Sequence, residues 1–158
     1  MGNKFYKRPV IRKIALIGIM ILLLIQLYQP ARNSDNGQVL PVHIEKVYAM
    51  PKSVQQALQN SCYDCHSNNT HYPWYSYIQP TRAFMESHIK DGKKDLNFSE
   101  FGNYSERKQQ SKLKSIIKQV KSGEMPLSSY TLIHKNAILP TAQKQEIITW
   151  INTLNKDE

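Results

Sequence analysis

The chain has 158 residues and a formal net charge of +9, from 21 Lys and Arg against 12 Asp and Glu. Five of the basic residues lie in the first thirty positions, so residue 31 onward carries 16 basic and 12 acidic residues. That mild excess excludes a dedicated nucleic-acid binder. The domain proper has about 115 residues, which is enough for one small hydrophobic core.

Residues 1–30 are typical of a targeting segment. They begin with a basic stretch that contains no acid: Lys4, Lys7, Arg8, Arg12 and Lys13. An apolar run over 14–25 follows, somewhat short against the ~20 residues that span a bilayer. We predict an uncleaved transmembrane signal anchor, with a cleaved signal peptide as the alternative. Positive charge keeps the N-terminal side in the cytoplasm, so the rest of the chain would face the periplasm from a bacterial inner membrane.

Residues 31–40 are polar and turn-rich, and they predict a linker to a single domain over 41–158. That domain is predicted to be all-α, because no stretch alternates strongly enough to demand a strand. Pro51 suits the first position of a helix that runs up to Cys62. A second helix is expected over 81–90, with Gly92 near its end, and 93–104 is expected to be irregular.

Two more helices are predicted in the second half of the chain. Ser105 can cap the first of them, in which apolar residues recur at helical spacing: Leu113, Ile116, Ile117 and Val120. Gly123 should end it, and a loop extends to Pro140. Thr141 can cap the last helix, whose inward-facing residues would be Ile147, Trp150, Ile151 and Leu154.

The only two cysteines lie in the sequence Cys-Tyr-Asp-Cys-His at 62–66. Cys-x-x-Cys-His is the attachment motif of c-type haem. Cys62 and Cys65 would form thioether bonds with the haem vinyl groups, and His66 would bind one face of the iron. The motif occurs once, so we predict one covalently attached haem c.

Three other chemistries use Cys-x-x-Cys. A structural zinc site wants four ligands, and the chain has no further cysteine. A thioredoxin-like redox pair follows a strand in a βαβ setting, whereas a helical segment precedes this pair. A structural disulfide across so short a loop would restrain little of the chain.

The second face of the iron requires a separate prediction. We favour Met125, in the loop Gly-Glu-Met-Pro at 123–126, because a proline stiffens the loop and a thioether suits an electron carrier. His88 is the rival ligand, and an open face is the third alternative. Met50 also precedes a proline, but it lies about 16 Å from the motif along the preceding helix.

Aromatic residues follow the motif closely, in His-Tyr-Pro-Trp-Tyr-Ser-Tyr at 71–77. Tyr72 and Trp74 are candidates for a wall around the porphyrin, with polar tips that reach a propionate. Ordinary core packing is the alternative interpretation of both.

Three segments together resemble a known family: Cys-Tyr-Asp-Cys-His-Ser-Asn at 62–68, His-Tyr-Pro-Trp-Tyr-Ser at 71–76 and Gly-Glu-Met-Pro at 123–126, with Tyr130 and Trp150. The chain is similar to the small haem-binding domain family of bacterial membrane-anchored c-type-cytochrome-like proteins. The resemblance implies a c-type haem and a helical fold like a short cytochrome c. It does not imply a catalytic activity.

We therefore expect a membrane-tethered monohaem c-type cytochrome rather than an enzyme. It would pass single electrons between periplasmic or membrane redox proteins. The alternative is a haem-based sensor, a ligand-binding protein or an accessory domain of a peroxidase system. A haem-free thiol–disulfide oxidoreductase is the third hypothesis.

Overall fold

The structure is a computed structural model that describes residues 7–154. This part of the chain contains helices and no strand, which confirms the all-α class. Its elements are α1 (Lys7–Ile25), α2 (Ile44–Val47), α3 (Lys52–Ser61), α4 (Tyr63–His66), η1 (Trp74–Tyr77), α5 (Thr81–Asp95), η2 (Phe98–Asn103), α6 (Glu106–Ser122), α7 (Ser128–Ile133), η3 (Lys135–Ala137) and α8 (Thr141–Leu154).

The chain divides into two compact units. The first contains the residues up to Arg32 together with Tyr72–Ser87, and the second contains Asn33–His71 and the residues from His88 onward. The predicted boundaries at 30/31 and 40/41 stay predictions. The second unit holds the Cys-x-x-Cys-His motif, so it is the unit that matters for the site.

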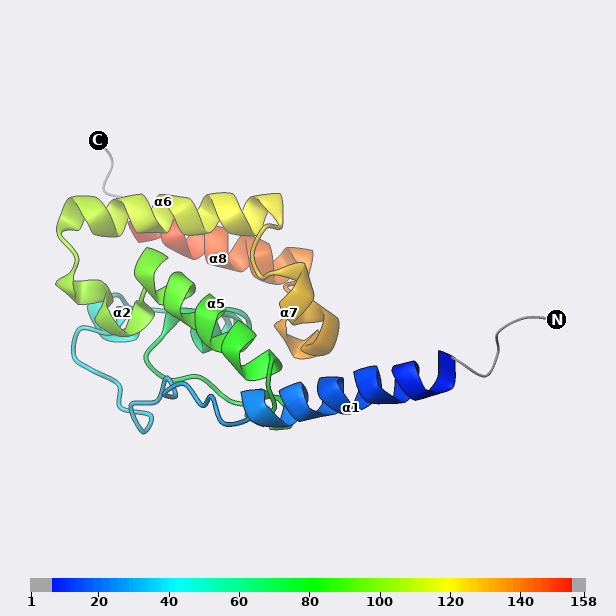
Figure 1. Ribbon diagram of the computed structural model, residues 1–158. Helices are drawn as coiled ribbons and strands as arrows, with labels where there is room; N and C mark the ends of the chain where they lie inside the picture. Colours follow the sequence, from blue (N-terminus) through cyan, green and yellow to red (C-terminus); the bar gives the residue numbers. More distant parts are fainter. Residues whose placement is uncertain (1–6, 155–158) are drawn as a thin grey trace. The chain divides into compact units, whose positions relative to one another are not determined.

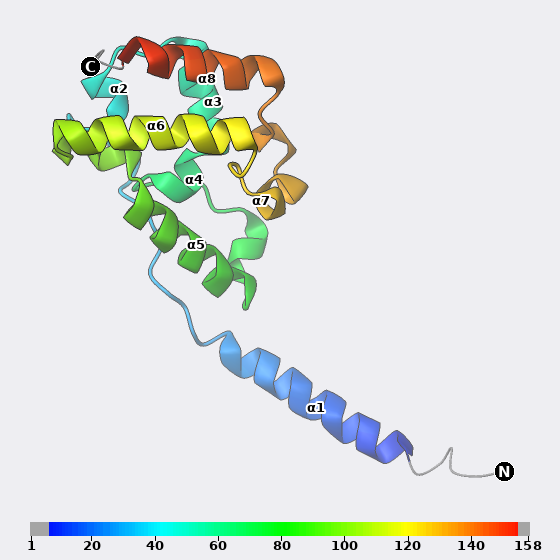
Figure 2. The same ribbon diagram turned by 90° about the horizontal axis from the view of Figure 1, so that it is seen from above.

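The second unit is built around α3, α6 and α8. Figures 1 and 2 both show α6 and α8 running side by side, and α3 also packs on α8. The core between the helices is apolar and includes Ile44, Val54, Leu58, Phe98, Phe101, Leu113, Ile116, Val120, Ile147, Trp150 and Ile151. Full burial of each large side chain contributes roughly 1.5–3 kcal/mol. This core fixes the end of α3, where the motif begins.

Helix α6 begins and ends where the sequence predicts. Leu113, Ile116 and Val120 are buried at helical spacing, so one stripe of the helix faces the core. Gly123 ends the helix with φ +76°, a left-handed conformation that glycine adopts without strain. Ser105 is the N-cap residue, although its side chain makes no capping hydrogen bond.

Helix α5 is longer than predicted, and this difference bears on the site. It runs over Thr81–Asp95, so Gly92 lies inside the helix rather than at its end. The segment expected to be irregular continues with η2. The short elements α2, α7 and η3 are absent from the prediction, because segments of four, six and three residues are too brief to show a hydrophobic period.

In the first unit, polar contacts join the end of α1 to the segment 72–87. The Gln26 side chain accepts the backbone N–H of Gln79 at 2.9 Å, and Arg82 donates to the carbonyl of Pro30. The guanidinium of Arg32 lies 4.2 Å from the centre of the Tyr77 ring, a cation–π contact. The first unit is thus held together by contacts of its own.

The predicted signal anchor covers residues 1–30, of which the structure describes 7–30. Over residues 7–154, no helix combines the length and the apolar character needed to cross a membrane. Arg12 and Lys13 lie within α1 and confine its uncharged stretch to 14–25. Lys4 of the predicted basic start lies outside the described residues.

Candidate functional site

The Cys-x-x-Cys-His motif occupies the junction of α3 and α4. The N–H of Cys62 donates to the Leu58 carbonyl at 2.8 Å and completes α3. The Cys62 carbonyl then accepts the N–H groups of Cys65 and His66 at 3.2 and 3.0 Å. Because residues three and four apart share one side of a helical turn, both cysteines and the histidine leave the backbone on the same side.

Tyr63, between the two cysteines, anchors the motif to the core. Its hydroxyl donates to Oε1 of Glu45 at 2.9 Å, and its ring centre lies 5.1 Å from that of Phe98. The hydroxyl thus has a hydrogen-bond partner and the ring packs against Phe98, so Tyr63 attaches the motif to the core.

The imidazole of His66 is oriented by the main chain of α5 and the residue after it. Its Nδ1 lies 2.9 Å from the Gly92 carbonyl oxygen and 3.1 Å from that of Leu96. Carbonyl oxygens only accept, so Nδ1 carries the proton and Nε2 keeps the lone pair. This is the arrangement that metal-binding histidines use, with the nitrogen away from the metal donating to a fixed oxygen.

Gly92 is the residue that lets α5 approach the motif. A Cβ atom at this position would lie 2.7 Å from the carbonyl oxygen of Cys65, which is closer than real Cβ contacts come. A side chain would therefore push α5 away from the motif and from His66. The glycine expected to stop a helix instead serves close packing.

Both cysteines are free thiols and are half-buried. Burial raises the pKa of Cys62 to about 12, with a smaller contribution from the charge of Cys65. Burial likewise raises the pKa of Cys65 to about 11, with a smaller contribution from Asp64. Catalytic Cys-x-x-Cys pairs have lowered thiol pKa values instead. The environment of these thiols therefore argues against a thiol–disulfide oxidoreductase.

Two cavities meet at the motif and share Ser61, Cys62, His66, Asp95 and Met125. The smaller has a volume of about 150 Å³, and its lining also includes Cys65, His88, Asp91, Gly92, Pro126, Leu127 and Tyr130. The larger has a volume of about 280 Å³, and its lining also includes Leu96, Phe98, Lys112, Ser115, Ile116, Gln119 and Val120. Together they reach the roughly 300–1,000 Å³ of a typical ligand pocket.

Met125 lines both cavities, and two hydrogen bonds hold the loop that carries it. Its N–H donates to the Gln119 carbonyl at 3.3 Å, next to the turn at Gly123. Five residues further on, the Tyr130 hydroxyl donates to Oδ2 of Asp64 at 2.6 Å. Asp64 lies inside the motif, so the methionine loop is bonded to the segment that carries the cysteines.

The structure brings most of the predicted site residues together. Cys62, Cys65, His66 and Met125 line the smaller cavity, as does the rival ligand His88. Tyr72 and Trp74 belong to the first unit and line neither cavity: Tyr72 donates to Oε1 of Glu86 at 2.8 Å, and Trp74 is 76 % exposed. Their role beside a porphyrin stays a prediction.

Several residues of the site could not be predicted from the sequence. Gly92 and Leu96 act through backbone oxygens, which leave no mark in a side-chain pattern. Asp64 and Tyr130 lie 66 positions apart, and their pairing has no local signal. No group of three or more His, Cys, Asp or Glu placed to hold a metal ion occurs among the described residues.

Comparison with known proteins agrees with the geometry. The family model of the haem-binding domain matches residues 20–153, which is most of the chain. The chain belongs to the haem-binding domain family. No curated protein and no solved structure matches it. Membership supports haem as the bound group.

Proposed function

We propose that this haem-binding domain is a monohaem c-type cytochrome that carries single electrons. Cys62 and Cys65 would each add a thiol across one haem vinyl group, forming the carbon–sulfur bond while the proton goes to the other vinyl carbon. His66 would be the proximal ligand, and Met125 the distal one. When bound, haem supplies reversible one-electron chemistry at its iron.

The orientation of His66 is the observation that carries this proposal. Two backbone oxygens hold Nδ1–H, which leaves Nε2 as the nitrogen available to a metal. The same helical turn presents both thiols, and Met125 shares the cavity with them. A structural Cys-x-x-Cys pair would not need an imidazole oriented in this way.

The residues around the cavities would serve an electron carrier in two ways. Phe98, Ile116 and Val120 are buried apolar side chains in the larger wall, and they would keep water from the iron. A thioether opposite an imidazole raises the reduction potential relative to two imidazoles. The proposal therefore assigns binding and tuning to this chain, and no catalysis.

We further propose a periplasmic location in a bacterium, with periplasmic or membrane redox proteins as partners. Covalent attachment of c-type haem takes place in that compartment, and the proposed bonds from the two cysteines depend on that attachment.

A haem-stained denaturing gel tests the proposal directly. The full chain, produced in a host that attaches c-type haem, should keep the stain and show c-type absorbance bands when reduced. The variant with Cys62→Ala and Cys65→Ala should lose the stain at equal expression. A wild-type band without stain would contradict covalent attachment.

Carbon monoxide separates the electron carrier from a haem-based sensor or ligand-binding protein. A closed distal site should resist carbon monoxide in the reduced wild type. Rapid and complete binding would favour the sensor.

A further inference from the structure

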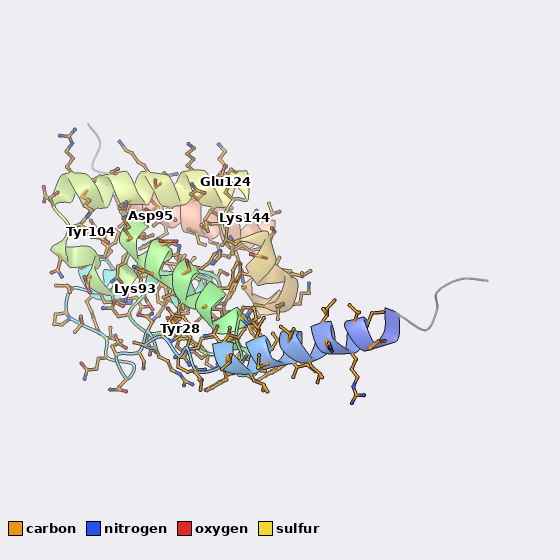
Figure 3. All side chains as sticks on the ribbon, viewed as in Figure 1. Tyr28, Lys93, Asp95, Tyr104, Glu124 and Lys144 are labelled. Carbon is orange, nitrogen blue, oxygen red and sulfur yellow. The ribbon has the colours of Figure 1, made fainter. Side chains whose placement is uncertain are left out.

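The two cavities beside the motif differ in charge. The smaller is lined by Asp91 and Asp95 from the last turn of α5, with no Lys or Arg in its wall. The larger shares Asp95 but adds the half-buried Lys112 of α6. Figure 3 shows Asp95 at the end of α5, beneath α6. Lys112 is thus the one Lys or Arg among the residues that line these two cavities.

The walls of the two cavities also differ in polarity. Four apolar residues line the larger cavity, from the segment after α5 and from α6: Leu96, Phe98, Ile116 and Val120. The polar residues of α6 lie along one edge of this wall, as Lys112, Ser115 and Gln119. These three are spaced three and four residues apart, so they share one face of the helix. The larger cavity therefore combines an apolar floor with a polar edge that carries a cation.

Haem has the complementary chemistry, with apolar faces and two carboxylates on one edge. A haem carboxylate in the smaller cavity would face both Asp91 and Asp95 and be repelled. In the larger cavity it would face Asp95 but also Lys112, which can donate a charge-assisted hydrogen bond to it. Ser115 and Gln119 can donate to the same oxygens. The apolar floor of the larger cavity suits the porphyrin face.

We infer that Lys112, with Ser115 and Gln119, forms the binding site for the haem carboxylates, so that the acidic edge of the porphyrin points toward α6. The inference rests on the proposed function. It adds three residues that the Cys-x-x-Cys-His motif does not include, all on one helix.

The test uses the full-length protein with attached haem. Lys112→Leu removes the cation, and Lys114→Leu removes the same charge from an exposed position on the same helix that lines neither cavity. The Lys112→Leu variant should shift the propionate bending bands in the resonance Raman spectrum. It should also have a lower reduction potential than the control, because a nearby cation favours the reduced iron. Lys112→Arg should restore both readouts.

Each result decides the matter. Unshifted propionate bands in stained Lys112→Leu protein would overturn the inference and leave the proposed function intact. An unstained wild type would overturn the proposed function and the inference with it. If Lys112→Leu does not accumulate, Gln119→Leu should give a smaller band shift in the same direction, and unchanged bands there would overturn the inference.

Discussion

The hydroxyl of Tyr130 donates a hydrogen bond of 2.6 Å to Oδ2 of Asp64, which lies between the two cysteines of the motif. Oδ1 of the same carboxylate accepts the backbone N–H of His71 at 2.9 Å. The bond joins α7 to the motif across 66 residues of sequence. Because Met125 lies five positions before Tyr130, this contact limits how far the methionine loop can move from His66.

Tyr130→Phe should therefore loosen the methionine without removing the haem. Loss of a hydrogen bond to a half-buried carboxylate costs about 1 kcal/mol, which corresponds to roughly a fivefold larger open fraction at the distal site. Carbon monoxide should then bind the reduced variant more readily, and the sulfur-to-iron charge-transfer band in the near infrared should weaken. Tyr48→Phe is the control, since its hydroxyl donates to Oε1 of Gln109 at 2.8 Å and Tyr48 lines neither cavity. Equal spectra for both variants would count against the positioning role of Tyr130.

Met125→Ala should abolish the charge-transfer band while the gel stain persists. The thioethers of Cys62 and Cys65 hold the haem independently of the distal ligand, so attachment does not depend on Met125. His88→Ala is the matched variant, because His88 lines the same cavity. Persistence of the band in Met125→Ala, together with its loss in His88→Ala, would reassign the distal ligand.

Gly92→Ala should destabilise the protein although alanine favours a helix. The new Cβ would lie 2.7 Å from the backbone oxygen of Cys65, which cannot turn aside as a flexible side chain can. We expect a loss of about 1–3 kcal/mol in the free energy of unfolding, measured by urea titration. Gly18→Ala in α1 meets no atom within 4 Å and should be neutral or slightly stabilising. Matching midpoints for Gly92→Ala and wild type would show that α5 can shift freely.

The haem-free protein should alkylate slowly. The reactive form is the thiolate, and burial raises the pKa of Cys62 to about 12 and that of Cys65 to about 11, from an ordinary value of 9.0. At about pH 8.5 the folded chain should therefore react with iodoacetamide much more slowly than the chain in urea. Faster reaction of the folded chain would mean that the thiols are activated, as in an oxidoreductase.

The same pKa values predict how the stability of the haem-free protein changes with pH. The folded haem-free chain holds the two thiol protons more tightly than the unfolded chain does. Their contribution to stability is therefore complete below the unfolded pKa near 9.0 and is lost as the pH rises toward 11 and 12. Urea titrations at rising pH should show this loss, and it should be smaller in the variant with both cysteines replaced by alanine.

The sequence predicts the parts of the fold that depend on long hydrophobic periods. Helix α6 follows from the spacing of Leu113, Ile116 and Val120 and from the glycine at 123. Helix α3 and its junction with the motif follow from Val54, Leu58 and the position of Cys62. The end of α5 could not be predicted from the sequence. A glycine near the end of a helix usually indicates where the helix stops, and only the structure shows that Gly92 is needed for the contact with Cys65.

The site divides in the same way. Cys62, Cys65, His66 and Met125 belong to local motifs, and the structure places them around one cavity. The oxygens that orient His66, the Asp64–Tyr130 bond and the lysine on α6 all depend on tertiary packing. The apolar run over 14–25 predicts a membrane span, and no described helix has the length and apolar character for one.

The acceptors for His66 are main-chain oxygens, and this limits how the chain can vary. No side-chain replacement deletes the carbonyls of Gly92 and Leu96, so a mutation reaches the protonated nitrogen of His66 only by moving the backbone, as a side chain at Gly92 would. Where a side-chain carboxylate holds a metal-binding histidine, one substitution can alter the basicity of the histidine. In this protein the basicity of His66 changes only if α5 moves. We therefore expect sequence differences among relatives in the loop that carries Met125 and among the polar α6 residues that line the larger cavity.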